Sequence, residues 1–381
     1  MLKVVKVRLY PNKAQQQLIQ KTFGSCRFVY NILLDAKIKA YECGDNVSAY
    51  ELKKRLVPMK KAEGGKFLKE VDSTALQNSV LKIDVAYKNF FRKVKKGEKS
   101  GFPRFKSKHY SRQSYQSSTV SIKNGKLYLP KIGEIKTKFH RGAIEGEIKT
   151  VTVSYEANQY YASINYEDGL KEKIGSNNGK SIGIDVGVKV FAYTSDNQKF
   201  KQIDLTKEIK KVIKAQKVLS RRKKGSKNRE KAKSKLAKKH LKLKNKRNDF
   251  LHKITKKLSE NQTIAVENLM IKNMSKKAKG SIENPNMRSS SKSGLNRSIL
   301  QQSWGKFFEL LEYKLKRNGG ELIKVNPKFT SQKCSCCGYI SKENRESQAK
   351  FVCKQCGYSA NADFNASLNI LNTAGTVAKA S

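Results

Sequence analysis

The sequence predicts a multidomain α+β protein, and three patterns lead to this fold class. Apolar and polar residues alternate within residues 1–10 and 115–168, as in strands that bury one face. Apolar residues recur at helical spacing in residues 13–41, 73–94 and 205–258. The C-terminal half adds short apolar strands and paired cysteines. With 381 residues, the chain has room for two or three domains, each with its own core.

Composition restricts the classes of partner. The chain carries 81 Lys and Arg against 31 Asp and Glu, a formal net charge of +50, and its cations are spread over most of its length. Like charges on one chain repel each other, so a net charge this large implies a polyanionic partner. Ribosomal and histone-like proteins have a similar charge, so the charge alone indicates binding and not catalysis. No apolar run reaches the roughly 18 residues of a spanning helix, and no signal peptide is recognisable. We expect no membrane association and a location in the cytoplasm or nucleoid.

The first hundred residues read as one strand followed by helices. Residues 1–10 predict a strand that stops at Tyr10-Pro11-Asn12, and residues 13–41 predict helices with a break at Gly24. A helix-turn-helix is one interpretation of this region, and we favour a packed helical bundle. A further helix over residues 73–94 ends in a run of cations.

Residues 101–108 interleave aromatic rings with cations, among them Arg104 and Lys106. Rings stack on bases and cations neutralise phosphates, so this segment suits nucleic acid. The alternative is a solvated linker anchored by two Phe side chains.

Residues 115–168 predict a β-rich region with a hairpin turn at Asn124-Gly125. Together with residues 1–10 it predicts a small barrel, into which the helices of residues 12–110 are inserted. A linker is predicted over residues 175–179.

The region of residues 205–258 is helical and overwhelmingly basic, with a break at Gly225-Ser226. Near the break lie Arg221, Arg222, Lys223 and Lys224. A charge run is usually a solvated face, but this one has too few acids to neutralise itself, so we interpret it as an arm that faces nucleic acid.

Two apolar strands each end in an acid. Residues 181–187 place Asp185 on the side of the strand that also carries two glycines, and residues 263–267 place Glu267 beside small residues. A buried acid needs a positive partner, such as a metal ion, although Asp185 alone is equally explained as a turn cap. Further strands are predicted at residues 190–195, 199–203 and 321–325. A mobile loop is predicted over residues 270–297, and after it one helix with a buried stripe that includes Leu300 and Trp304.

Two repeated cysteine knuckles predict a structural zinc site. The unit Cys-x-x-Cys-Gly-Tyr occurs twice, and its four thiolates, Cys334, Cys337, Cys353 and Cys356, suit tetrahedral zinc. The alternatives are coincidence or a redox dithiol. Cys336 leaves the register ambiguous, but the repeated Cys-Gly-Tyr ending selects Cys337.

A third acid, Asp363, falls in the first turn of a predicted helix just after the second knuckle. An acid there is ordinarily explained by the helix dipole. Taken with Asp185 and Glu267 it gives three carboxylates, which repel one another unless divalent cations are present. Mg²⁺ or Mn²⁺ prefers such oxygen ligands, and a pair of these ions supports phosphodiester cleavage.

The sequence resembles the TnpB family, the insertion-sequence proteins often called transposase OrfB, over essentially its whole length. The resemblance rests on the segments 10–12, 23–24, 27–31, 76–77, 86–91, 101–106, 183–187, 266–269, 329–332 and 363–366. It implies an RNA-guided DNA endonuclease with a RuvC-like domain of the RNase H-like fold, related to compact type V CRISPR effectors. Asp185, Glu267 and Asp363 match the family's catalytic triad, and Gln77 matches a contact to the adjacent-motif duplex.

The resemblance also implies a domain plan and partners. The wedge barrel comprises residues 1–11 and 111–175, and the helical recognition domain comprises residues 12–110. The nuclease domain comprises residues 176–327 and 361–381, with a zinc-binding insertion at residues 328–360. The expected partners are a guide RNA made from the transposon end, with one protein per RNA, and a double-stranded DNA target cut beside a short adjacent motif. A nucleic-acid-binding regulator that does not cut, and an accessory transposase, are the alternative functions.

Overall fold

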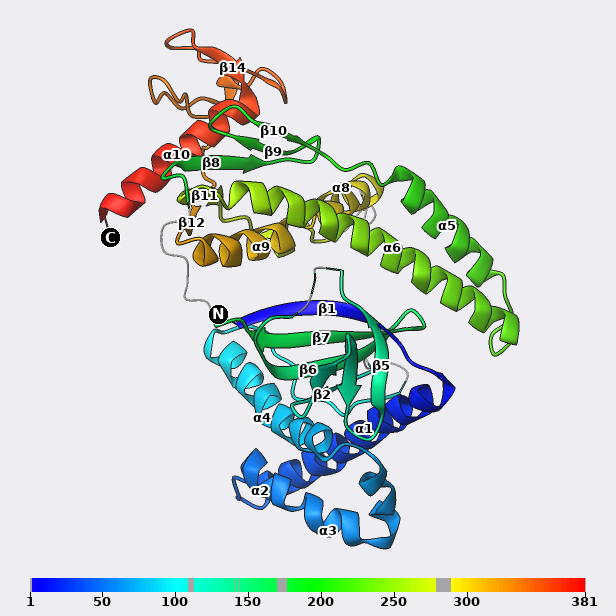
Figure 1. Ribbon diagram of the computed structural model, residues 1–381. Coiled ribbons are helices and arrows are strands. Elements are labelled where there is room, and N and C mark those ends of the chain that lie inside the picture. The colour runs from blue at the N-terminus through cyan, green and yellow to red at the C-terminus, as the bar shows by residue number, and fades with distance from the viewer. Residues whose placement is uncertain are drawn as a thin grey trace. The chain divides into compact units, whose positions relative to one another are not determined.

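The computed structural model describes residues 2–108, 113–140, 142, 144–169, 177–278 and 289–380, with side chains as far as residue 375. The chain divides into two compact units, Met1–Lys171 and Glu172–Ser381, each with its own sheet and core (Figure 1). This boundary falls just before the predicted linker, of which residues 175 and 176 lie outside the described residues. The finer division into four domains stays a prediction.

The first unit contains a seven-stranded sheet in the order β2-β6-β7-β1-β5-β4-β3. Its strands are β1 (Leu2–Tyr10), β2 (Ser114–Ser117), β3 (Ser121–Lys123), β4 (Lys126–Leu129), β5 (Gly133–Lys138), β6 (Glu147–Glu156) and β7 (Gln159–Glu167). β1 pairs with β7 along most of its length and with β5 at its end, so the N-terminal strand joins the two halves of the sheet. The hairpin turn between β3 and β4 is confirmed, since Asn124 and Gly125 both take positive φ. Closure into a barrel stays a prediction.

Helices pack against this sheet and share its core. They are α1 (Lys13–Glu42), α2 (Ala49–Lys54), α3 (Leu56–Lys61), a 3-10 helix (Glu63–Glu70) and α4 (Ser73–Lys95). Asn12 and Gln15 cap α1 reciprocally, which explains its sharp start. Side chains such as Leu33 of α1, Ile83 of α4 and Leu127 of β4 belong to one buried cluster.

The break predicted at Gly24 is wrong. α1 continues through Gly24 as one helix of 30 residues, because a lone glycine weakens a helix without ending it when both neighbouring turns are packed. Buried residues on either side, Phe23 and Cys26 among them, hold the two halves in line. Within described residues 2–46 there is thus one strand and one helix, and no helix-turn-helix.

The second unit is built on a five-stranded mixed sheet in the order β10-β9-β8-β11-β12. Its strands are β8 (Ser181–Val186), β9 (Val190–Thr194), β10 (Lys199–Lys201), β11 (Thr263–Glu267) and β12 (Glu321–Val325). β8, β9 and β10 form an antiparallel meander, whereas β11 and β12 run parallel to β8. All five strands were predicted from the sequence.

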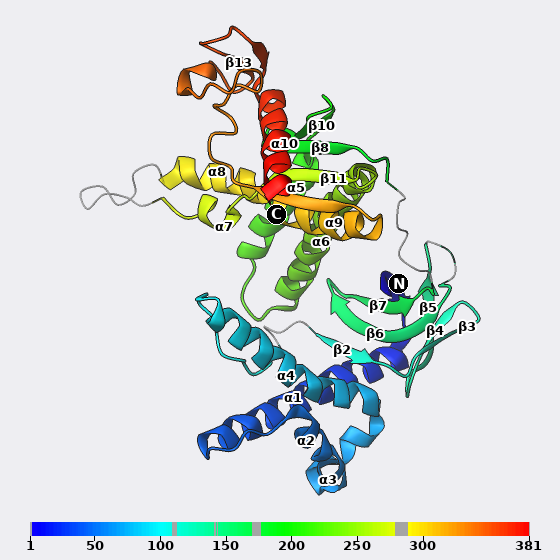
Figure 2. The same ribbon diagram turned by 90° about the vertical axis from the view of Figure 1, so that its left-hand side faces the viewer.

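Helices cover both faces of this sheet (Figure 2). One face packs against α6 (Lys227–Leu258) and α9 (Trp304–Arg317), through buried residues such as Leu251 and Phe307. The other face packs against α10 (Ala362–Ala380), where Ala265 meets Ile370 and Ala374. The unit is therefore a three-layer α/β/α structure. α5 (Thr206–Ser220) and α6 form a hairpin with its turn at the predicted break.

The region after β11 differs from the prediction. The structure has a short helix α7 (Ile271–Met274) within the predicted loop and a helix α8 (Ser289–Gln302) that begins in it and runs past its end, while residues 279–288 lie outside the described residues. The single predicted helix is two, because Ser303 adopts a left-handed conformation (φ 58°) that a right-handed helix cannot continue through. The break rotates α8, so Ile299 is buried and Leu300 is exposed, the reverse of the predicted stripe.

The cysteine knuckles form a small module between β12 and α10. It contains a 3-10 turn (Lys342–Asn344) and the hairpin of β13 (Lys350–Val352) and β14 (Ser359–Asn361). Phe351, Cys353 and Ala362 form its core, so the module is packed directly onto the start of α10. None of the described helices is both long enough and apolar enough to span a bilayer.

Candidate nuclease centre and metal module

Sheet register brings Asp185 and Glu267 together. β8 and β11 are parallel neighbours, and their last paired residues are Ile184 and Val266. Asp185 and Glu267 each come one residue after this last pair, so they lie at equivalent positions on neighbouring strands, at the carboxyl-terminal edge of the sheet. Parallel strands place their carboxyl ends at one edge, which is where ligands bind in open α/β sheets.

The face from which the acids project is the face covered by α10. Side chains two residues apart on a strand share a face, so Asp185 lies on the side of Gly183 and Glu267 on the side of Ala265. A Cβ on Gly183 would lie 2.1 Å from the carbonyl oxygen of Ser367 in α10, which shows how closely the helix crosses the strand. Ser367 is one turn beyond Asp363, so this crossing carries the third acid toward the first two.

The charges of Glu267 and Asp363 act on Asp185. Burial, and then the negative charges of Glu267 and Asp363, raise the pKa of Asp185 well above its usual value. Burial also raises the pKa of Glu267 and of Asp363. Carboxyls whose charged forms are this unfavourable bind cations readily, since a cation removes both the desolvation cost and the repulsion.

Two further residues contact the acids. Thr330 donates a hydrogen bond of 2.5 Å from its Oγ1 to Oε1 of Glu267, and its own carbonyl accepts from Asn369 of α10. Arg345, in the cysteine module, places a guanidinium nitrogen 3.6 Å from Oδ1 of Asp363. The Arg345 charge opposes the rise in pKa of all three acids. Thr330 lies in a segment that the resemblance includes, whereas no motif in the sequence points to Arg345.

The four predicted cysteines form a compact ligand cluster. Their sulfur atoms all lie within 4.8 Å of one another, with 3.8 Å between Cys334 and Cys356 and 3.6 Å between Cys337 and Cys353. Sulfurs at the corners of a zinc tetrahedron with bonds near 2.3 Å stand about 3.8 Å apart, so the cluster fits a metal such as zinc. Among the described His, Cys, Asp and Glu side chains this is the one group gathered so tightly.

The two knuckles have the same backbone geometry. In each, the glycine after the second cysteine takes positive φ, 81° at Gly338 and 74° at Gly357, and donates its N–H to the carbonyl of the first cysteine. Only glycine adopts this conformation without strain. The repeated Cys-x-x-Cys-Gly-Tyr unit is therefore a repeated structure, with Cys337 in the cluster and Cys336 exposed outside it.

The predicted nucleic-acid contacts fall in both units. Gln77 on α4, Arg104 and Lys106 belong to the first unit, where Gln77 and Lys106 are half-buried and Arg104 is exposed. Arg221, Arg222, Lys223 and Lys224 are exposed on the turn between α5 and α6, at the end of that hairpin away from the sheet of its unit (Figure 1). These seven residues are not part of the acidic site.

The fold and the site define a class: a strongly basic α+β protein with an acidic carboxyl edge on a mixed sheet and an adjoining metal module of four cysteines. Curated proteins similar over nearly the whole chain give the family. A putative RNA-guided DNA endonuclease, InsQ, of Escherichia coli is 37% identical across 97% of this chain and 92% of its own length. A putative RNA-guided DNA endonuclease of Streptomyces pristinaespiralis is 34% identical across 98% of this chain and 90% of its own length. The chain belongs to the TnpB family, the OrfB proteins of insertion sequences.

Family profiles match three segments. The OrfB profile described as a probable transposase matches residues 163–278, and a Cas12f1-like TNB domain matches residues 304–370. The third, described as a helix-turn-helix domain, matches residues 1–46, where the structure has β1 and α1 instead. Among solved structures, the mini-RNA-guided endonuclease CRISPR-Cas_phi3 aligns over 98% of this chain and 92% of its own, with 11% identity and a TM-score of 0.49.

Proposed function

We propose that this protein is a guide-RNA-directed DNA endonuclease of a transposable element, which cuts target DNA next to a short adjacent motif. The names of its full-length relatives in Escherichia coli and Streptomyces support this activity. The observation that carries the proposal is the parallel register of β8 and β11, which sets Asp185 beside Glu267 under the helix that bears Asp363.

The second unit is, on this proposal, a RuvC-like domain of the RNase H-like fold. Its support is the strand order β10-β9-β8-β11-β12, with β9 antiparallel to its neighbours and α10 crossing the acidic face. The nuclease domain comprises residues 176–327 and 361–381, with a zinc-binding insertion at 328–360. The first unit divides into a wedge barrel, residues 1–11 and 111–175, and a recognition domain, residues 12–110.

Asp185, Glu267 and Asp363 would hold two Mg²⁺ or Mn²⁺ ions, which supply activation of a water and stabilisation of the leaving oxygen in phosphodiester hydrolysis. The protein's own groups set up this site. Thr330 fixes the orientation of the Glu267 carboxylate, and Arg345 offsets part of the negative charge near Asp363. The four cysteines would hold zinc with no open coordination position, so their role is structural.

The proposed partners are one guide RNA per protein and a double-stranded DNA target. The net charge of +50 supports a polyanionic partner. The proposed contacts to these nucleic acids are Gln77, Arg104, Lys106 and the turn cations Arg221, Arg222, Lys223 and Lys224. We place the protein in the cytoplasm, associated with the nucleoid when bound to DNA.

Plasmid cleavage tests the proposal. The protein purified with its RNA should linearise a matching plasmid when Mg²⁺ is added. Asp185→Asn should reduce cutting at least about 100-fold while guided binding persists, since it removes a charged ligand without adding bulk. Asp249→Asn, an exposed acid on α6, is the matched control and should cut like the wild type.

Two other outcomes would point to a different function. Guided binding without Mg²⁺-dependent cutting by the wild type would indicate a regulator. Joined donor ends in a strand-transfer assay would indicate a transposase. Undiminished cutting by Asp185→Asn would remove the assignment of the acidic site.

A further inference from the structure

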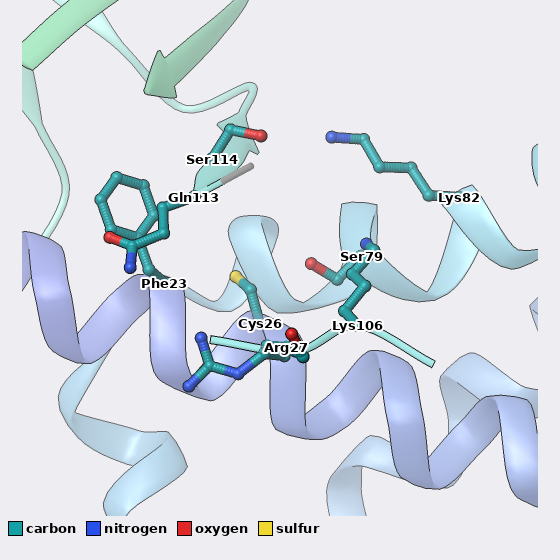
Figure 3. Close-up of a pocket in the computed structure, with 9 residues that line it drawn as sticks. Phe23, Cys26, Arg27, Ser79, Lys82, Lys106, Gln113 and Ser114 are labelled. Carbon is teal, nitrogen blue, oxygen red and sulfur yellow. The ribbon is translucent and has the colours of Figure 1, made fainter. Parts of the chain in front are cut away.

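The first unit contains a cavity of about 320 Å³ between α1, α4 and the chain segments at residues 106–107 and 113–114 (Figure 3). Arg27 enters it from α1 and Lys82 from α4, on opposite sides of the view, with Lys106 and the sulfur of Cys26 between them. None of the elements described for the acidic site contributes to it.

The charge of this cavity is entirely positive. Arg27, Lys82 and Lys106 line it, and none of its described lining residues is acidic. All three cations are half-buried, and in the described part of the chain none of them has an ion pair. The ammonium of Lys106 lies instead over the ring of Tyr30, 3.6 Å from its centroid.

Holding these cations together is unfavourable for the protein alone. Burial, followed by the charge of Lys82, lowers the pKa of Lys106 to about 8, and burial lowers the pKa of Lys82 as well. Half-buried charges without counter-charges destabilise a fold, so their presence around an open cavity indicates an anion that completes the site.

The chemistry of the lining selects phosphate. A guanidinium offers a fork of donors, and two ammonium groups add compact charges, a combination suited to the several oxygens of a phosphate group. Ser114 adds a hydroxyl group to the wall, whereas the Ser79 hydroxyl donates to the Ala75 carbonyl of its own helix. The volume is within the usual range for a ligand site and leaves room for the sugar attached to the phosphate.

We propose that this cavity binds one phosphate group of a nucleic-acid strand, through Arg27, Lys82 and Lys106. The inference rests on the proposed function and deepens it, because it assigns a place in the first unit where the bound strand is held. The phosphate is either an internal phosphodiester or a 5′-terminal phosphate, and the experiment separates these sources.

The test measures binding of a single-stranded RNA oligonucleotide, prepared with a 5′-hydroxyl or a 5′-phosphate, to the full chain at several salt concentrations. The double variant Arg27→Gln/Lys82→Gln should bind about 10-fold more weakly. Its plot of log affinity against log salt should be shallower by about 0.7 for each phosphate that the variant no longer neutralises. Lys82→Arg, which keeps the charge, should retain wild-type binding.

Two measurements control for folding and for charge. The double variant should have a melting temperature no lower than that of the wild type, because it relieves repulsion between buried cations. Lys88→Gln removes one charge from an exposed position on the same helix, outside the cavity, and should lose less affinity than Lys82→Gln.

A loss confined to the 5′-phosphorylated RNA would identify a terminal phosphate, and an equal loss with both RNAs an internal one. Wild-type affinity in the double variant, or a loss in Lys82→Gln no larger than in Lys88→Gln, would overturn the cavity assignment alone. Failure of the wild type to bind either RNA would overturn the proposed function together with it.

Discussion

Arg345 reaches the acidic site from the cysteine module, 3.6 Å from Asp363, with about a third of its side chain exposed. Its charge makes ionisation of Asp185, Glu267 and Asp363 less unfavourable. A cation that neutralises part of an acid cluster limits repulsion between the acids and helps to position them before metal ions bind. Arg345 is therefore a positioning residue of the site.

We expect Arg345→Ala to slow Mg²⁺-dependent cleavage by roughly 10- to 100-fold, the range found when supporting contacts of metal ligands are removed. Arg345→Lys should recover part of the rate because the charge is kept. Lys342→Ala, an exposed neighbour in the module, should cut normally. Equal rates for Arg345→Ala and Lys342→Ala would show that Arg345 has no part in the site.

Lys106 provides a pH-dependent test of the strain in the basic cavity. Its pKa is lowered to about 8 in the folded protein, from 10.5, and the groups near it are Lys82, Cys26 and the ring of Tyr30. The folded state therefore binds fewer protons than the unfolded state between pH 8 and pH 10.5, so this residue's unfavourable contribution is complete below pH 8 and fades as the pH rises.

Lys106→Met should consequently be more stable than the wild type at pH 7, by about 1–3 kcal/mol in free energy of unfolding. The difference should shrink as the pH approaches 10. Denaturant unfolding of the two proteins at both pH values measures it, and a difference that grows with pH would contradict the assigned shift.

At the scale of elements, the cysteine module is packed against the start of α10 and hydrogen-bonded to it. Ala362 at the start of α10 is part of the module core, and Asn365 of α10 accepts a hydrogen bond from the Ser335 amide and donates one to the Lys333 carbonyl. Since Asp363 lies between these two contacts, the module's fold determines where this acid sits.

Cys353→Ser should thus lower both zinc content and cleavage, with a loss of several kcal/mol in the stability of the module. Cys336→Ser is the matched control, because Cys336 is exposed and outside the ligand cluster. Metal analysis and cleavage assays give the comparison. A well-folded wild type without zinc would refute a structural metal.

The crossing of α10 over β8 depends on Gly183. A methyl group there would meet Ser367 and Leu371 of α10, with backbone atoms at 2.1 and 2.8 Å, and backbone cannot move aside as a side chain can. Gly183→Ala should destabilise the second unit by at least about 1–3 kcal/mol and reduce cleavage.

Gly294→Ala is the control for this substitution. Gly294 lies in α8 with open space around its Cα, so alanine should leave stability unchanged or raise it by up to about 1 kcal/mol. Thermal unfolding distinguishes the two variants. A Gly183→Ala protein as stable as the wild type would show that the contact between α10 and β8 leaves room for a side chain at this position.

For the whole molecule, the net charge of +50 governs both stability and binding. Like charges on one chain repel, and salt screens them over about 10 Å at 0.1 M. We expect the melting temperature of the protein without nucleic acid to rise between 50 and 500 mM NaCl, and affinity for RNA to fall steeply over the same range.

Differential scanning fluorimetry and anisotropy measure these opposite trends. Sucrose added at constant ionic strength is the control for the binding trend: it should leave the affinity for RNA nearly unchanged because it does not screen charges, although it raises the melting temperature by its exclusion from the protein surface. A melting temperature that falls with salt would mean that internal ion pairs outweigh the net repulsion.

The sequence by itself determined most of the strands, several of the long helices and the chemically distinctive residues. Alternation located the strands that carry Asp185 and Glu267, and repeated spacing located the four cysteines. These are local properties: a strand's period, a knuckle's glycine and a turn's Asn-Gly are fixed by neighbours a few residues away. For the same reason, local pattern misplaced a break at Gly24 and missed the one at Ser303, since packing of whole helices decides both.

Tertiary structure alone decided which distant residues meet. The parallel pairing of β8 with β11, the close passage of α10 over Gly183 and the reach of Arg345 toward Asp363 join residues that lie far apart in the chain. The cavity of Arg27, Lys82 and Lys106 likewise joins three segments. Such contacts depend on the packing energy of whole layers, which no short stretch of sequence contains.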